Sequence, residues 1–333
     1  MPHSHHSHSG QFCKHAAGTL EDVVLEAIRQ GFSTYGLTEH VPRYRPQDLY
    51  PEEEAAGLST DALRAQFAAF LAEAHRLKEA YADRINLLVG LETEFITDTD
   101  MDELDALLRA TNVDGGPARI EYLVGSVHHV RGIPIDFDRD TYLRALSTFR
   151  PTIQLNEEHD EHATMEAFLC AYLDAQHALL TRFRPEVVGH FDLCRLYTPQ
   201  LRFADYPAAL ERVRRNVAVA VEYGAAFELN AAAFRKGWDA AYPGADVVEI
   251  ISQAGGRFVL SDDSHGPHAV GLNYRRIPEY ARRMGISELW VLERDDQVRN
   301  AAGRNVVLRK VPGEWLEHPF WNRKLEEQEN NVS

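Results

Sequence analysis

The sequence contains little cysteine, no long apolar run and a shortage of positive charge. Its 333 residues include three cysteines, Cys13, Cys170 and Cys194, and none of them forms a CxxC pair. This odd number and wide spacing predict neither a disulfide framework nor a zinc site built from thiolates. No apolar run approaches the roughly 18 residues of a membrane span, and no cleavable signal segment is recognisable. We therefore expect a reduced, cytoplasmic protein.

The shortage of positive charge limits the partners that the surface can attract. Lysine and arginine total 35 against 51 aspartates and glutamates, which leaves a formal net charge of −16. Such a surface repels polyanions, so we expect no nucleic-acid partner, and nothing indicates a membrane partner. A small phosphorylated substrate drawn to local cations remains compatible with this charge. The oligomeric state cannot be predicted from these features.

Histidine, by contrast, is abundant, with sixteen residues in the chain. Five of them fall in the first fifteen residues: His3, His5, His6, His8 and His15. Imidazole is the commonest metal ligand, and residues i and i+2 of a strand share a face, so such a pair can bind one ion. Expression tags and disordered leaders also contain histidine runs. Serines interrupt this run, however, and it continues into a helix start at Thr19, which argues against a tag.

Segments with strand character alternate with helical segments along most of the chain. The strand-like segments cover residues 33–40, 85–95, 120–130, 185–192, 225–230 and 257–265, with one more near 287–292. This alternation predicts a parallel sheet. Ionisable residues end nearly every strand, which favours a closed or nearly closed α/β barrel over an open sheet with one switch point. We interpret residues 1–333 as a single domain, with an acidic helical excursion near 131–183 and a polar tail from about residue 303.

The strand ends supply a set of nitrogen and oxygen ligands without cysteine. They are the N-terminal histidines, His40, Glu92, His128, His190, Asp263 and His265. Imidazole and carboxylate together suit zinc, manganese or iron. A single histidine is more often a hydrogen-bonded structural residue, but six strand ends that all carry possible ligands are hard to obtain by chance. The sequence therefore predicts a metal centre at the carboxyl end of the barrel.

Seven motifs in a fixed order carry a family resemblance over about four fifths of the chain. They are HSHSGQFCKHA, GLTEH, VGLETEF, LVGSVHH, VVGHFD, ELNAAAFRKG and LSDDSH. With them the chain resembles the PHP superfamily, and within it the monofunctional histidinol-phosphate phosphatases of fungal type. The resemblance implies a distorted (β/α)7 barrel with a trinuclear site for divalent zinc, manganese or iron.

The resemblance also implies which residues bind the three ions. His6, His8, Glu92 and Asp263 match the first site, and Glu92 bridges to a second ion held by His128 and His190. His15, His40 and His265 match the third. The spacing before His15 leaves open whether His5 replaces one residue of the His6/His8 pair.

The implied reaction is the hydrolysis of L-histidinol phosphate to L-histidinol and phosphate in histidine biosynthesis. Water between two ions loses a proton near neutral pH and can attack phosphorus in line. Asp263 and His265 are the candidates for proton transfer to the leaving group. Candidate contacts to the substrate, a phosphate monoester, are Arg235, Lys236, Asn230 and Arg43. The cations of Arg235 and Lys236 suit phosphate, although an exposed charge pair explains them equally well.

Two other functions are compatible with the same motifs. One is a PHP phosphoesterase that acts on a nucleotide or a nucleic-acid end; the charge of −16 and the lack of a polymerase-like region count against it. The other is a non-catalytic metal-binding protein, which would bind ions without hydrolysing a phosphate ester.

Overall fold

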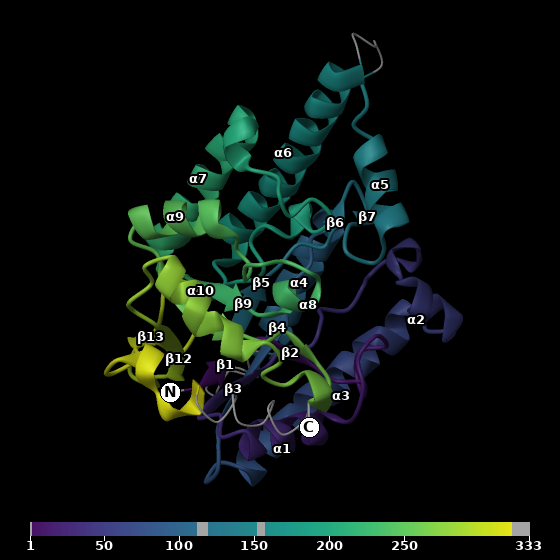
Figure 1. The fold of residues 1–333 in the computed structure, drawn as a ribbon. Coiled ribbons are helices and arrows are strands. Elements are labelled where there is room, and N and C mark those ends of the chain that lie inside the picture. Colours follow the sequence, from purple (N-terminus) through teal and green to yellow (C-terminus); the bar gives the residue numbers. More distant parts are fainter. Residues whose placement is uncertain (1, 112–118, 152–156, 322–333) are drawn as a thin grey trace, which may run out of the picture.

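The computed structural model describes residues 2–111, 119–151 and 157–321 (Figure 1). The side chains of residues 157–159 are not described either. Part of the expected excursion, residues 152–156, and the end of the expected tail, residues 322–333, therefore lie outside the described residues.

Seven parallel strands form the central sheet. In sheet order they are β1 (His3–Ser4), β3 (Thr34–Leu37), β4 (Asn86–Glu92), β5 (Tyr122–Gly125), β8 (Val187–Val188), β9 (Ala226–Asn230) and β10 (Arg257–Ser261). Just after β1, the backbone N–H of His5 donates to the carbonyl of Leu260 on β10 at 3.2 Å. This bond joins the first strand to the last, so the expected (β/α)7 barrel is confirmed.

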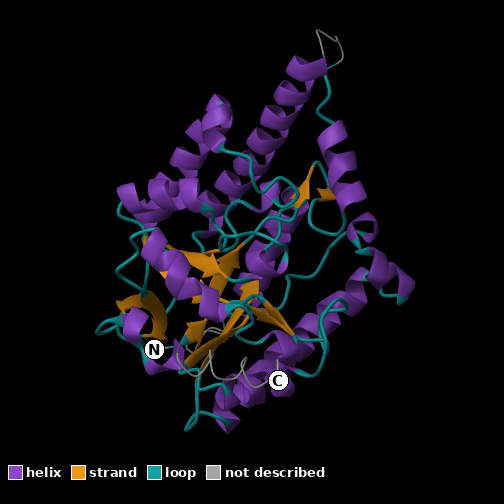
Figure 2. Cartoon of the chain, viewed as in Figure 1, coloured by secondary structure: helices purple, strands orange, loops and turns teal. Residues whose placement is uncertain are grey.

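Helices lie around the outside of the strands (Figure 2). They are α1 (Leu20–Arg29), α2 (Pro51–Ala55), α3 (Thr60–Ala80), α4 (Asp98–Thr111), α5 (Arg139–Ser147), α6 (Glu157–Phe183), α7 (Pro207–Tyr223), α8 (Ala232–Arg235), α9 (Ala245–Gln253) and α10 (Ile277–Arg283). The first of them begins at a capping box. Thr19 Oγ1 accepts from the N–H of Asp22 at 3.1 Å, and Asp22 accepts from the N–H of Thr19 at 2.9 Å. These two bonds satisfy N–H groups that a helix start leaves free.

Two glycines make room for a tyrosine in the barrel. The hydroxyl of Tyr122 donates to the carbonyl of His5 at 2.8 Å. A Cβ atom at Gly36 would lie 1.9 Å from that hydroxyl oxygen, and one at Gly90 would lie 2.7 Å from the tyrosine ring. Only residues without a side chain can occupy these two positions, and so the N-terminal segment is fixed against the neighbouring strands.

The predicted strand near 287–292 and the polar tail need correction. β12 (Trp290–Arg294) pairs antiparallel with β13 (Val306–Lys310) and, among the described residues, with no strand of the barrel. Leu292 and Val306 of this hairpin pack onto Val259 and other buried barrel residues. The described part of the tail is therefore folded: alternating apolar residues in both strands bury one face of the hairpin.

The aromatic residues that follow β13 extend the main core. Trp315, Phe320 and Trp321 are buried in the same hydrophobic cluster as Leu20 of α1. This continuous cluster joins the residues after β13 to α1 and the barrel.

The expected helical excursion follows a small hairpin of β6 (His129–Val130) and β7 (Ile133–Pro134). Figure 1 shows α5 and α6 rising away from the barrel. Buried residues of α5, such as Tyr142, still belong to the main core, so the excursion is anchored at its base. Within the described residues, no helix combines the length and apolar character that a membrane span requires.

Candidate metal centre and active site

The functional side chains converge where the strands end. β2 (Ser7–His8) and β11 (Ser264–His265) pair beyond the barrel proper, and they set His8 directly opposite His265. A cavity of about 630 Å³ opens at this end. Its walls include many predicted ligands: His15, His40, Glu92, His128, His190, Asp263 and His265.

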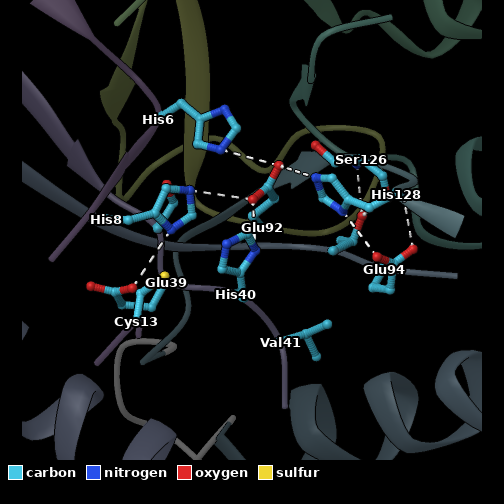
Figure 3. Close-up of polar contacts among 12 residues, drawn as sticks. His6, His8, Cys13, Glu39, His40, Val41, Glu92, Glu94, Ser126 and His128 are labelled. Carbon is cyan, nitrogen blue, oxygen red and sulfur yellow. Dashed lines mark hydrogen bonds and ion pairs between the residues drawn. The ribbon is translucent and has the colours of Figure 1, made fainter. Parts of the chain in front are cut away.

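The carboxylate of Glu92 lies at the centre of five imidazoles. Figure 3 shows four of them, those of His6, His8, His40 and His128, around Glu92. Its Oε1 atom is 2.9–3.1 Å from ring nitrogens of His6, His128 and His190. Its Oε2 atom is 2.9 Å from His40 Nδ1 and 3.3 Å from His8 Nε2. Residues from five separate strand ends therefore meet at a single carboxylate.

The structure places His6 and His8, and not His3 and His5, at this centre. His3 Nε2 accepts from the N–H of Leu260 at 2.9 Å, and His5 Nε2 accepts from the N–H of Leu292 at 3.0 Å. His3 and His5 thus bond to backbone of β10 and of the β12–β13 hairpin. The alternative in which His5 replaces a member of the pair has no support in this arrangement.

Asp263 completes the cluster in a strained conformation. One of its carboxylate oxygens lies 3.7 Å from Nε2 of both His6 and His8, and 3.7 Å from Nδ1 of His265. Its φ angle is +46°, in the left-handed region that residues with a side chain seldom adopt. Strain of this kind is typical of functional positions, where the surrounding structure enforces it.

Three further glutamates hold the imidazoles and were missed in the sequence. Glu39 accepts from Ser9 at 2.8 Å beside His8, Glu94 lies 2.9 Å from His128 Nδ1, and Glu228 lies 3.2 Å from His6 Nδ1. Glu94 also contacts His129 Nδ1 at 2.9 Å, which gives His129 a structural place behind the centre. A carboxylate on the outer nitrogen fixes the orientation of a metal-binding histidine. All three glutamates lie within two residues of the end of a strand, and this position is the signal that could have identified them.

Electrostatics inside the cluster reflect this crowding. Burial by itself would lower the pKa of His8, but the neighbouring carboxylates of Glu39 and Glu92 raise it to about 9. Burial would raise the pKa of Glu92, yet the imidazoles of His6 and His128 hold it well below its ordinary value. Burial, together with His8, lowers the pKa of His40.

The donor set fits divalent metal ions. Buried ring nitrogens without a hydrogen-bond partner among the described residues include His6 Nε2, both nitrogens of His8, and His40 Nε2. Buried polar atoms are normally paired, so ring nitrogens without hydrogen bonds around a carboxylate fit the role of ligands to a cation. Four groups of residues each have ligand atoms that lie within 4.8 Å of one another inside the group. They are His6, Glu92 and His190; His6, His8 and Asp263; His8, His40 and Glu92; and Cys13, His15, His40 and His265.

The expected substrate contacts are divided between the cavity and the layer behind it. Arg235 and Lys236, at the end of α8, line the cavity. Asn230 is fully buried, and it donates to Glu228 at 2.7 Å and to Asp263 at 3.3 Å. We therefore assign Asn230 a positioning role.

Arg43 also lies off the wall of the cavity. Its guanidinium pairs with Glu53 and stacks on the ring of Tyr50, 4.7 Å from the centroid. It supports the loop that carries Tyr50 to the cavity, and we replace the expected substrate contact with this supporting role. Lys14, Glu52, Phe137 and Tyr242 line the cavity as well, and they were not predicted from sequence as contacts. Asp136 of the acidic excursion, for which a solvated face was the expected role, also lines the cavity.

A family model for the PHP domain matches residues 4–232. The chain belongs to the PHP family. This PHP protein is 42% identical over 314 residues to a Schizosaccharomyces pombe protein named "Probable histidinol-phosphatase", an alignment that covers 93% of this chain and 96% of the relative. It is 31% identical over 352 residues to the Saccharomyces cerevisiae histidinol-phosphatase, covering 96% and 99% of the two chains.

Among solved structures, the PHP protein is similar in fold to a histidinol phosphate phosphatase from Lactococcus lactis. The TM-score is 0.60, at 20% sequence identity, and the match covers 87% of this chain and 96% of the other. That structure holds zinc, L-histidinol and phosphate.

Proposed function

We propose that this PHP protein is a histidinol-phosphatase, which hydrolyses L-histidinol phosphate to L-histidinol and phosphate with divalent metal ions. The observation that carries the reaction is Glu92, which lies within 3.3 Å of five imidazoles, four of them buried, at a cavity that Arg235 and Lys236 also line. The names of the yeast relatives, together with identity over nearly the whole chain, support the substrate. Zinc is the metal that the Lactococcus lactis structure supports.

We further propose a trinuclear centre. His6, His8, Glu92 and Asp263 would hold the first ion, and Glu92, His128 and His190 the second. His15, His40 and His265 would hold the third. Bound ions supply positive charge that stabilises the phosphoryl oxygens and acidify nearby water. Zinc, manganese and iron all suit these ligands, and metal analysis distinguishes them.

The chain's own residues have three tasks in this proposal. Arg235 and Lys236 attract the phosphate group by their positive charge. Asp263, whose pKa is held well below its usual range by His6 and His265 despite its burial, is ionised and accepts a proton from the attacking water. Asp263 then returns that proton, with His265 beside it, to the departing oxygen of histidinol. The proton that the water loses during the attack therefore ends on the hydroxyl group of histidinol.

The remaining walls suit the organic part of the substrate. Histidinol carries an amine and an imidazole. Asp136 offers a carboxylate to the ammonium group, and Phe137, 45% exposed although it lines the cavity, offers a ring to the imidazole. These two residues come directly after β7, so the excursion would contribute to substrate selection.

A screen of phosphate monoesters tests the proposal. Histidinol phosphate, an aryl phosphate, a nucleoside monophosphate and a DNA end carrying a 3′-phosphate are offered to metal-loaded protein, with metal content measured on the same sample. We expect hydrolysis of histidinol phosphate in clear preference to the nucleotide substrates. Preference for a nucleotide would contradict histidinol phosphate as the substrate. Metal binding without hydrolysis of any ester would show that the protein is a metal-binding protein and not an enzyme.

We also propose that the protein works in the cytoplasm. All three cysteines are free, as a reducing compartment would leave them.

A further inference from the structure

A cysteine joins the group of histidines that our proposal assigns to the third ion. Cys13 lies in the loop between β2 and α1, and its side chain is buried. Its sulfur lies 3.1 Å from His15 Nε2. That sulfur and one ring nitrogen each of His15, His40 and His265 all lie within 4.8 Å of one another. Figure 3 shows the sulfur beside Glu39, on the side of the centre that holds His8 and His40.

The spacing of these atoms suits a single tetrahedral ion. Zinc binds sulfur at about 2.3 Å and imidazole nitrogen at about 2.0–2.1 Å, so two such ligands on one tetrahedral ion lie about 3.5 Å apart. The separation of 3.1 Å between the Cys13 sulfur and His15 Nε2 is close to that value. The other donor atoms of the group lie no more than 4.8 Å apart, which is compatible with the same ion. Cys13 and His15 are neighbours in the sequence, whereas His40 and His265 come from two other parts of the chain. The fold therefore brings the four donors together.

Two independent features of the histidines point to a ligand at this position. The Nδ1 atom of His15 is bonded to Glu52 at 2.9 Å, which leaves Nε2 directed at Cys13. A carboxylate on one nitrogen is the usual arrangement for a histidine that binds metal through the other. His40 likewise contacts Glu92 through Nδ1, while its buried Nε2 has no hydrogen-bond partner among the described residues.

We propose that the Cys13 thiolate is a fourth protein ligand of the ion held by His15, His40 and His265. This inference rests on the metal-dependent function proposed above. On binding, the S–H bond is replaced by a sulfur–metal bond and the proton passes to solvent. Thiolate is a soft ligand, so this position selects zinc and other thiolate-binding ions over manganese, although the other two positions have only nitrogen and oxygen donors. The three ions are thus not equivalent in metal preference.

Cobalt(II) provides a direct readout of the sulfur. The full-length protein is stripped of metal and reloaded with cobalt(II), and its absorption spectrum is recorded together with the bound cobalt. We expect visible d–d bands and, in addition, a near-ultraviolet band from charge transfer between thiolate and cobalt. Cys13→Ser should abolish the near-ultraviolet band, retain the d–d bands and lower the bound cobalt by about one ion per chain. Cys170→Ser, at a half-buried position on α6 outside the cavity, is the matched control and should keep the whole spectrum.

The outcomes separate this inference from the function on which it rests. A wild-type spectrum with d–d bands and no charge-transfer band overturns the role of Cys13 and leaves the metal-dependent function standing. Persistence of the charge-transfer band in Cys13→Ser overturns it as well. Failure of the wild-type protein to bind any cobalt overturns both proposals. If Cys13→Ser does not fold, X-ray absorption of the zinc-loaded wild type still decides, because one sulfur neighbour at about 2.3 Å is required.

Discussion

Glu228 Oε2 lies 3.2 Å from Nδ1 of His6, on the side of the ring away from Glu92. Both side chains are fully buried, so Glu228 fixes which nitrogen of His6 faces the centre. The same carboxylate accepts from the backbone N–H of His190 at 2.6 Å through its other oxygen. One glutamate on β9 therefore orients two of the proposed ligands from two other parts of the barrel.

Removal of this charge should weaken the metal centre without removing a ligand. For Glu228→Gln we expect a loss of about 10–100-fold in metal affinity or activity, which is usual when the partner of a metal-binding histidine is changed. Metal titration followed by activity at saturating metal distinguishes loss of affinity from loss of turnover. Glu222→Gln, an exposed position on α7, is the control and should behave as wild type. Unchanged affinity and activity in Glu228→Gln would contradict a role for Glu228 in orienting His6.

Asp263→Asn should remove activity while the fold is retained. Asparagine tolerates the left-handed φ angle of +46° at least as well as aspartate, so backbone strain does not increase. The variant lacks both a charged ligand and the proposed proton acceptor, for which the expected cost is at least about 10²–10⁴-fold in turnover. Phosphate release and circular dichroism measure the two properties. Normal turnover would show that the end of β10 is wrongly assigned.

Arg235→Ala should raise KM for phosphate esters more than it lowers kcat. A hydrogen bond to a charged group is worth about 1.5–3 kcal/mol, so we expect KM to rise by about tenfold or more. Initial rates over a range of histidinol phosphate concentrations separate the two constants. Arg202→Ala, which removes an exposed arginine outside the cavity, is the matched control. Equal KM values in the two variants would return Arg235 to a role as an exposed surface charge.

Asp136→Asn should discriminate between substrates. If Asp136 binds the ammonium group of histidinol phosphate, KM should rise for that substrate and stay constant for an aryl phosphate, which lacks the amine. The ratio of kcat/KM for the two esters measures this preference directly. A proportional change for both esters would assign Asp136 to general support of the cavity.

An ion-pair network behind the cavity should make stability depend on acid pH. Arg195 lies 2.6 Å from Asp192 and 2.6 Å from Asp246. Burial would raise the pKa of Asp246, but Arg195 lowers it overall. Because the folded-state pKa lies below the ordinary value of about 3.9, this stabilisation is complete above that pH and is lost as pH falls through the lower folded-state pKa.

Asp246→Asn should therefore lower the free energy of unfolding by about 2 kcal/mol near neutral pH, since Arg195 retains Asp192 as a partner. The difference from wild type should shrink below about pH 4, because Asp246 is protonated there first in the unfolded chain and, at lower pH, in the folded protein. Urea unfolding of metal-free protein at several pH values measures both effects. A difference that stays constant down to pH 2.5 would contradict a lowered pKa for Asp246.

The barrel could be predicted from sequence because its signals are local and repeated. Each strand is a short apolar segment, and a ligand such as His40 or Glu92 follows it within a few residues. Parallel strands end at the same side of a sheet, so local patterns were enough to bring these residues together. The observed strands are shorter than expected at this end. After β5, for example, the backbone N–H of His128 leaves the sheet to donate to Glu94 at 3.0 Å.

The supporting contacts could not be predicted because they depend on distances across the fold. Arg43 follows a predicted strand end and carries a suitable charge, yet Glu53, ten residues later, pairs with it. The choice between His5 and His6 depended on Leu292, an N–H donor near the other end of the chain. The β12–β13 hairpin resembled one more strand followed by a tail, since a strand's pairing partner cannot be read from its own residues.

Metal content and histidinol phosphate hydrolysis, measured on the same sample, decide whether this protein is a phosphatase with a three-metal centre. The protein should carry no N-terminal tag, because the buried segment that includes His6 and His8 begins within a few residues of Met1. We expect close to three ions per chain, loss of hydrolysis on chelation, and recovery when zinc, manganese or iron is returned. Full activity in protein that binds no metal would contradict it.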